Sequence, residues 1–318
     1  MELSLIICTY NREEYLQKTL DCIASQTLDR SKFEVIIVDN NSADSTKIVA
    51  KNYVENHSNA RYIFEEKQGL SYARNTGYKE AKSDNLLYLD DDAYLNPEGL
   101  ENLVKFINSD ENLTIVGGRA IIKYPQDKPE WVTKSVVNWL GSYDYGDEVI
   151  EVTPENIKKK IVRFPIGCCF FVRKKVLDEI GGFNPKLGRV GKKMLAGEEF
   201  LISKYVQKKQ GKITYFPEIK VDHAIVPHWL DREFLLNKTS FYGISDVYVH
   251  FLSEKSLFAH IKYFAFRMIF LIKNIIDYLF ALITGNQQKQ FEVKLLLNFN
   301  KSIISTFMKF MFSPQTNT

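Results

Sequence analysis

The sequence has few cysteines and no pairing pattern among them. Its four cysteines are Cys8, Cys22, Cys168 and Cys169, and none forms a C-x-x-C pair. Structural zinc sites and small disulfide scaffolds both depend on closely spaced cysteines. We therefore expect reduced thiols that mostly fill the core of a cytoplasmic protein.

Long hydrophobic runs and a strong charge of one sign are missing as well. No stretch of about 18 uncharged apolar residues occurs, so we expect no ordinary membrane-spanning helix. The segment MELSLIICTYNREEY lacks the basic region and the apolar run of a signal peptide. The net charge of +3 is too small to indicate nucleic-acid binding, and we expect no such partner.

What the sequence does have is a regular alternation of apolar strands with amphipathic helices. Ser42 is the predicted cap of one helix, and Asn96 the predicted cap of another that has Pro97 at its first position. Strands buried on both faces and separated by helices predict an α/β fold with a doubly wound, mostly parallel sheet. The predicted strands are LSLIICTY (3–10), FEVIIVDNNS (33–42), RYIFEE (61–66) and NLLYLDDD (85–92).

The pattern loosens in the middle of the chain and changes again towards its end. Residues 123–160 mix aromatic, charged, Gly and Pro positions, which indicates long loops over a binding face. From about Asp231 onward the chain is predicted to be helical and is rich in Phe, Ile and Lys. We expect an α/β domain over residues 1–230 and a C-terminal helical extension over residues 231–318.

Acidic side chains follow two of the predicted strands at the point where each strand ends. Asp39 closes EVIIVD, and Asp90, Asp91 and Asp92 close NLLYLD. In an open α/β sheet the carboxyl ends of parallel strands share one edge, and ligands bind there. Carboxylates in such a cluster suit a hard divalent cation, which would relieve their repulsion and hold a diphosphate. A solvated polar loop is the alternative for the aspartates alone.

Four segments in this order resemble a family 2 glycosyltransferase with the GT-A fold. They lie within roughly residues 2–225 and read SLIICTYNREEYLQKTLDCIASQT, FEVIIVDNNSADST, GLSYARNTGYKEAKSDNLLYLDDDA and GEEFLISKYV. The resemblance implies transfer of a sugar from a nucleotide-diphosphate donor to a glycan or lipid-linked acceptor, with inversion at the anomeric carbon. It also implies a need for Mn²⁺ or Mg²⁺, and the habits of the family favour UDP.

The resemblance also implies roles for individual residues. Asp92 and Asp90 match the outer positions of the family's Asp-x-Asp motif, and His223 resembles a later histidine that completes the metal shell. His228 lies five residues further on and stays open as an alternative ligand. The residues implied at the nucleotide are Thr9, Tyr10, Asp39, Arg74, Asp90 and Asp91.

A pair of glutamates supplies two candidates for the catalytic base. Glu198 and Glu199 open a predicted helix, where acidic residues also occur simply because they favour the helix dipole. An inverting transfer needs a carboxylate that takes the proton of the acceptor hydroxyl. The family usually has Glu-Asp with the second residue as the base. By that match we favour Glu199 over Glu198, although the side chain here is one methylene longer.

Residues 256–282 predict one long helix with a polar arc. At about 100° per residue the polar side chains span an arc of about 160°. Such a helix can lie on an anionic membrane surface, which would place the protein on the inner face of the cell membrane, or it can pack on the catalytic domain. The polar residues are His260, Lys262, Arg267, Lys273, Asn274 and Asp277.

Two other functions remain open from the residues. A nucleotidyltransferase normally has a glycine-rich basic loop after its first strand, and CTYNREEY has no glycine there. A non-catalytic sugar-nucleotide-binding subunit of a glycan-assembly complex would not need Asp90, Asp92 and Glu199, which are all present.

Overall fold

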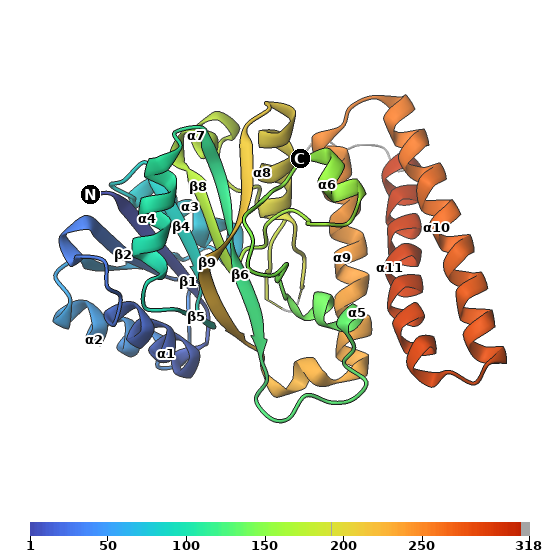
Figure 1. Ribbon diagram of the computed structural model, residues 1–318, viewed down its shortest axis with the longest axis horizontal. Coiled ribbons are helices and arrows are strands. Elements are labelled where there is room, and N and C mark those ends of the chain that lie inside the picture. The colour runs from blue at the N-terminus through green and yellow to red at the C-terminus, as the bar shows by residue number, and fades with distance from the viewer. Residues whose placement is uncertain (192, 313–318) are drawn as a thin grey trace.

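The computed structural model describes residues 1–191 and 193–312. One mixed sheet of nine strands forms the centre of the molecule, and its main path runs β3-β2-β1-β4-β8-β6-β9-β5. In Figure 1 the N-terminal helices lie at one end of the molecule and three long C-terminal helices at the other. The α/β class and the C-terminal helical extension are therefore confirmed.

The first four strands are parallel, as the sequence predicts. The register pairs Thr9 with Asp39 and Cys8 with Asp90, so the ends of three strands meet at one edge. Helix α3 packs on β1 and β2, where a side chain on Gly77 would collide with Ile6. These elements are β1 (Leu3–Thr9), α1 (Glu13–Ala24), β2 (Phe33–Asp39), α2 (Thr46–Asn56), β3 (Ala60–Phe64), α3 (Leu70–Glu80) and β4 (Asn85–Asp90).

The second half of the sheet mixes parallel and antiparallel pairs. Strand β8 runs antiparallel to β4 and β6, whereas β6 and β9 are parallel. The short β5 pairs antiparallel with the far half of β9, which places Ala93 opposite His223. These elements are β5 (Ala93–Leu95), α4 (Gly99–Ser109), β6 (Leu113–Lys123), α5 (Lys134–Val137), β7 (Ile150–Glu151), α6 (Pro154–Lys158), β8 (Cys169–Arg173), α7 (Lys174–Ile180), α8 (Glu198–Lys208) and β9 (Lys212–Ala224).

Both predicted helix caps are wrong, because tertiary contacts take the side chains. The hydroxyl of Ser42 accepts a hydrogen bond from the backbone of Asn11, and α2 begins only at Thr46. The side-chain oxygen of Asn96 accepts from the backbone of Lys220 on β9, and α4 begins at Gly99. In each case the polar residue joins two distant segments and does not cap its own helix.

The cysteines are free thiols, as expected. Cys168 and Cys169 are buried, and Cys8 and Cys22 are partly buried. Burial raises the pKa of Cys8 to about 12, so its thiol stays protonated in the core.

The three C-terminal helices lie side by side, with α10 outermost (Figure 1). They are α9 (Arg232–Ser253), α10 (Leu257–Ile283) and α11 (Gln287–Phe312). Helix α9 packs against α8 of the sheet domain, and α11 lies against both α9 and α10. No helix among the residues described has the length and apolar character required to cross a bilayer.

Helix α10 turns most of its predicted polar arc towards the protein. His260 and Asn274 are buried, and Arg267 makes an ion pair of 2.5 Å with Asp246 on α9. Of the six polar side chains, only Lys262 and Lys273 are exposed. Most of the arc therefore faces the protein, where α9 supplies partners for its polar groups.

A pair of histidines joins α9 to α10. The Nε2 atom of His250 lies 2.9 Å from the Nδ1 atom of His260, and one ring must donate while the other accepts. Burial lowers the pKa of His250 to about 4, and His260 and Lys204 add to this, while Asp246 and Glu254 oppose it. The fold therefore favours a neutral His250.

The histidine pair predicts a loss of stability in mild acid. In the unfolded chain His250 takes up a proton near its ordinary pKa of 6.5, whereas in the folded protein it does so only near pH 4. Stability therefore falls as the pH drops through this window. The double variant His250→Phe/His260→Phe keeps the aromatic packing and cannot protonate. We expect a melting temperature that falls less between pH 6.5 and 4 in the variant than in the wild type. Parallel curves for the two proteins, measured by calorimetry, would contradict the assignment.

Candidate active site

A cavity of about 990 Å³ opens at the carboxyl ends of the parallel strands. The ends of β1 and β4 form one wall, and the loop before β8, the start of α8 and α9 form the others. Ligand sites in open α/β sheets lie at this edge. Of the site residues predicted from the sequence, all except Asp39 line the cavity: Thr9, Tyr10, Arg74, Asp90, Asp91, Asp92, Glu198, Glu199 and His223.

Asp90, Asp92 and His223 form a group that could hold a metal ion. One ligand atom from each residue lies within 4.8 Å of the others. The pairing of β5 with β9 creates this group, because Asp92 precedes Ala93 and His223 lies opposite Ala93. Two carboxylates and an imidazole are a suitable donor set for a divalent cation. The residues present therefore fit the metal that the sequence predicts.

The orientation of His223 also fits a metal ligand. Its Nδ1 atom lies 3.3 Å from the carbonyl oxygen of Gly141, which can only accept, so Nδ1 carries the proton. The Nε2 atom lies 3.5 Å from the Oδ1 atom of Asp92, to which a charged ring can donate, and a bound cation would take the place of that proton. A second nitrogen held by a backbone carbonyl is the usual arrangement of metal-binding histidines. His228 packs against the ring of Phe234 instead and is not part of the group.

Asp92 is held in its charged form by cations on both sides. Arg12 makes an ion pair of 3.2 Å with its Oδ2 atom. Burial alone would raise the pKa of Asp92, but His223, Arg12 and Arg189 hold it at about 2. The sequence analysis missed Arg12, although it stands three residues beyond the end of β1, at the edge where the site was expected.

Asp91 has a different environment from its two neighbours. Burial raises its pKa to about 7, with Asp92 adding to the rise and Arg12 opposing it. Its backbone carbonyl accepts a hydrogen bond of 2.8 Å from Thr19 on α1. Asp91 thus anchors the acidic turn to α1 and sits outside the metal group.

Arg74 lies at the centre of the acidic residues on the other side of the cavity. Its side chain is 3% exposed and makes an ion pair of 2.7 Å with Glu198. Glu199 and Asp90 lie at 3.7 and 3.4 Å from its guanidinium nitrogens. A side chain on Gly167 would approach this guanidinium to 2.4 Å, so glycine at that position lets the loop before β8 pass close over it.

The two glutamates differ in their contacts. Glu198 is 3% exposed and points at Arg74, and burial together with Glu199 raises its pKa while Arg74 opposes the rise. The Oε1 atom of Glu199 accepts a hydrogen bond of 2.7 Å from the backbone of Gly167. Its Oε2 atom is buried, lies 3.7 Å from Arg74 and, like the Oε2 atom of Glu198, has no hydrogen-bond partner among the described residues. Glu199 thus has one oxygen anchored and one free of hydrogen bonds.

The predicted nucleotide residues are only partly at the cavity surface. Thr9 and Tyr10 line it, and Tyr10 is 41% exposed. Asp39 is buried, and its two oxygens accept hydrogen bonds from the backbone of Ser42 and the hydroxyl of Tyr62. Asn40, which the sequence analysis did not name, lines the cavity at this end.

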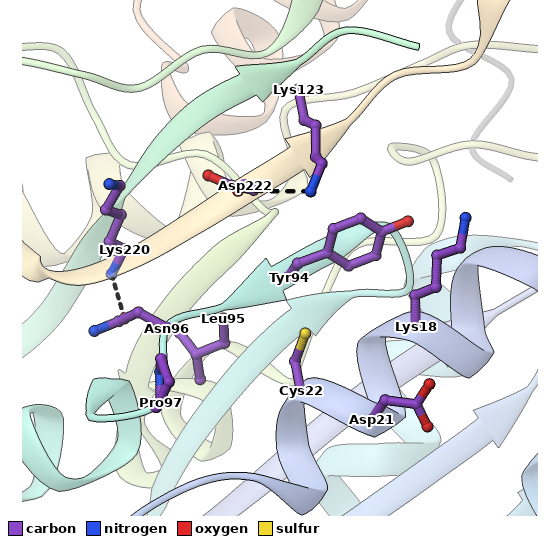
Figure 2. A pocket seen from close by; sticks show the side chains of 10 residues that line it. All are labelled: Lys18, Asp21, Cys22, Tyr94, Leu95, Asn96, Pro97, Lys123, Lys220 and Asp222. Atoms are coloured by element: carbon purple, nitrogen blue, oxygen red, sulfur yellow. Dashed lines mark hydrogen bonds and ion pairs between the residues drawn. The ribbon is translucent and has the colours of Figure 1, made fainter.

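A second hollow of about 510 Å³ lies beside α1 and β5 (Figure 2). Its charged side chains are largely exposed, and Lys123 lies 3.9 Å from Asp222 across β6 and β9. None of its residues belongs to the group of candidate metal ligands, Asp90, Asp92 and His223, found in the described part of the chain. The larger cavity is therefore the candidate active site.

Comparison with known proteins defines the class of the molecule. The family model "Glycosyl transferase family 2" matches residues 4–181, more than half of the chain. The chain therefore belongs to glycosyl transferase family 2, and this membership decides against the nucleotidyltransferase alternative.

Two relatives come from Haloferax volcanii. Glycosyltransferase AglE is 33% identical over 181 residues, which cover 57% of this chain and 55% of AglE. Glucosyl-dolichyl phosphate glucuronosyltransferase is 24% identical over 251 residues, covering 77% of this chain and 76% of the relative. The chain thus aligns with little more than half the length of AglE.

Solved structures share the fold across nearly the whole chain. The mannosyltransferase PcManGT from Pyrobaculum calidifontis, in complex with GDP-Man and Mn²⁺, has a TM-score of 0.62 at 16% identity. The alignment covers 99% of this chain and 88% of PcManGT. Residues 1–349 of TarS from S. aureus, in complex with UDP, give 0.55 at 17% identity, with 99% and 93% covered. These likenesses establish the GT-A-like fold.

Proposed function

We propose that the protein is a metal-dependent, inverting glycosyltransferase that moves a sugar from a nucleotide-diphosphate sugar to a glycan or lipid-linked acceptor. The observation that carries the proposal is one cavity that holds both the Asp90, Asp92 and His223 group and the partly free carboxylate of Glu199. Such a reaction needs both: a site for the charge of the diphosphate and a proton acceptor.

Asp90, Asp92 and His223 would hold the metal. Because Arg12 already binds the Oδ2 atom of Asp92, the Oδ1 atom that faces His223 is the one left for the ion. The imidazole favours Mn²⁺ over Mg²⁺, which prefers oxygen ligands alone. A bound ion would supply Lewis-acid stabilisation of the diphosphate leaving group.

Glu199 would act as the base. As the acceptor oxygen forms its bond to the anomeric carbon and the bond from that carbon to the diphosphate breaks, the hydroxyl proton passes to the free Oε2 atom of Glu199. The gain of a proton also removes the repulsion between Glu199 and Glu198. Glu198 is less suited, because Arg74 binds its Oε1 atom at 2.7 Å in the buried wall of the site.

The identity of the nucleotide is a separate proposal. We favour UDP, which the family's habits suggest and which the TarS structure contains. PcManGT binds GDP-Man, so the fold accommodates a guanine nucleotide as well. Thr9, Tyr10, Asp39, Arg74, Asp90 and Asp91 remain the proposed nucleotide contacts, with Asn40 added from the cavity lining.

A non-catalytic sugar-nucleotide-binding subunit is the alternative. Gly167 holds one carboxylate oxygen of Glu199, and the other has no hydrogen-bond partner in the described residues. This arrangement argues against the alternative, because a binding protein needs no proton acceptor at that position. Hydrolysis or transfer of a nucleotide sugar by the purified chain separates the two functions.

We also propose that the protein lies on an anionic membrane surface through α10. Thirteen of the 22 exposed large apolar side chains in the described residues belong to this helix, among them Phe258, Ile269 and Phe280. Its two exposed charged side chains are Lys262 and Lys273, which at about 100° per residue lie beside the row formed by Phe258, Ile269 and Phe280. Apolar insertion flanked by lysines is typical of helices that bind anionic lipid.

The metal site predicts the effect of Asp92→Asn. The change keeps the shape of the side chain and removes a charge from the proposed metal group. We expect transfer to be abolished while the fold is kept, because the amide is a poor ligand for a hard cation. Activity is measured with Mn²⁺ and with EDTA. A folded Asp92→Asn protein with near-normal activity in EDTA would exclude the metal-dependent reaction.

The base predicts different effects for the two glutamates. Glu199→Gln keeps the hydrogen bond from Gly167 at Oε1 but cannot take a proton, so turnover should fall by about 10²- to 10⁴-fold with little change in donor affinity. Glu198→Gln is the matched control and should reduce turnover less. Donor binding is followed by calorimetry and turnover with a fixed acceptor. A larger loss in Glu198→Gln would reverse the assignment, and normal turnover in both variants would place the base elsewhere.

The membrane proposal predicts lipid binding that depends on the outer face of α10. The wild type should sediment with phosphatidylglycerol-containing vesicles, and Phe258→Gln/Ile269→Gln/Phe280→Gln should not. Lys262→Gln/Lys273→Gln should weaken binding by about 30-fold, since each lysine near an anionic surface contributes about 1 kcal/mol. Ile48→Gln, on the exposed face of α2, is the control.

Two outcomes contradict the membrane proposal. Equal sedimentation of the wild type and the triple α10 variant would show that the helix does not carry the binding. A wild type that is dimeric by light scattering and ignores vesicles, with a monomeric triple variant, would assign the apolar face to self-association.

A further inference from the structure

Two cations in the cavity have no anionic partner. Neither Lys238 nor Arg189 makes an ion pair or a side-chain hydrogen bond within residues 1–191 and 193–312, and both line the cavity. The other four basic side chains there are all engaged: Arg12 with Asp92, Arg74 with Glu198, Arg163 with the carbonyl oxygen of Ser142, and Lys204 with the hydroxyl of Ser253.

Lys238 is buried, although a buried ammonium without an anionic partner is unfavourable. It lies on α9, near the start of that helix, and is 2% exposed. Its Nζ atom is 3.9 Å from the centre of the Trp229 ring and 5.6 Å from that of Tyr242. Cation–π contacts offset only part of the free energy lost when an ammonium leaves water. Burial lowers the pKa of Lys238 far below its usual value, Arg189 lowers it further, and Asp92 opposes this.

Arg189 approaches the same tryptophan. Its guanidinium carbon lies 5.1 Å from the centre of the Trp229 ring, so both cations contact one indole. Their mutual repulsion is unfavourable as long as nothing negative lies between them or beside them. The ring of Trp229 lies 6.0 Å from that of His223, centre to centre, which places the pair close to the proposed metal group.

We propose that Lys238 and Arg189 form an anion subsite, with Trp229 as its support, that binds a phosphoryl or carboxylate group of the substrate. The inference rests on the proposed function, since the substrate must enter this cavity. An ammonium offers three donors and a guanidinium a planar fork, and both match the oxygens of these anions. The anion would supply the hydrogen bonds and the opposite charge that the two side chains lack.

Two groups of a substrate could fill the subsite, and they share this chemistry. One is the terminal phosphate of the donor's diphosphate, whose position beside Asp92 would suit both cations. In that case the two side chains also stabilise the negative charge that collects on the leaving oxygen, because the electron pair of the broken bond stays there. The other is an acidic group carried by the transferred sugar, such as the carboxylate of a uronic acid.

The subsite makes a prediction that a structural lysine would not. Lys238→Met removes a buried, unpaired charge and keeps the packing on Trp229 and Tyr242. The ligand-free protein should therefore melt at the same temperature as the wild type or higher, while ligand affinity falls. Arg189→Met should give the same loss of affinity. Lys204→Met, which removes a lysine that already has a partner in the same cavity, is the matched control.

The experiment is calorimetry of the full chain with UDP, UMP, UDP-glucose and UDP-glucuronate in the presence of Mn²⁺, and with GDP and GMP in addition. If the subsite takes the diphosphate, Lys238→Met and Arg189→Met should bind the nucleoside diphosphate about 10- to 100-fold more weakly and the monophosphate normally. If it takes an acidic sugar, the loss should be confined to UDP-glucuronate. Wild-type affinity of both variants for all ligands would overturn the inference. A wild type that binds none of the nucleotides would instead contradict the proposed function itself.

Discussion

The architecture of the site depends on one buried cation, the guanidinium of Arg74. It joins α3, where it originates, to Asp90 at the end of β4 and to Glu198 and Glu199 at the start of α8. Three carboxylates this close together would repel one another strongly in a dry cavity wall, and the shared cation offsets that repulsion. This one side chain thus links the parallel half of the sheet to the helix with the candidate base.

The parts of the site that lie close in sequence were predictable, and the parts that form by distant pairing were less so. Asp90 and Asp92 follow one strand, and their spacing alone indicates a cation site. His223 is 131 residues beyond Asp92. The sequence indicated His223 as a ligand only through the family resemblance. The physical cause of its position is the register of β5 with β9. Arg12, Arg189 and Lys238 were missed, because nothing in a sequence distinguishes a cavity cation from the many basic residues of a surface.

The same limit explains the errors in local structure. Periodicity identified the helix at residues 257–283 but could not tell which side faces the protein, since that depends on partners in α9. His250 and Asp246 provide them, so His260 and Arg267 turn inward and the apolar side is left outside. Ser42 and Asn96 are residue types that often cap helices. Here their side-chain oxygens accept hydrogen bonds from distant backbone groups, so they do not cap the helices that follow them.

The Glu-Glu sequence at the start of α8, where the family usually has Glu-Asp, is consistent with the division of contacts around Arg74. A base beside an arginine is weakened, because the positive charge stabilises its unprotonated form. Glu198 takes the short contact with Arg74 at 2.7 Å, whereas the Oε2 atom of Glu199 remains at 3.7 Å. The hydrogen bond from Gly167 holds the other oxygen of Glu199, so the longer side chain is still fixed in direction. In this arrangement Glu198 makes the short ion pair with the arginine, and Glu199, the proposed base, makes only the longer contact.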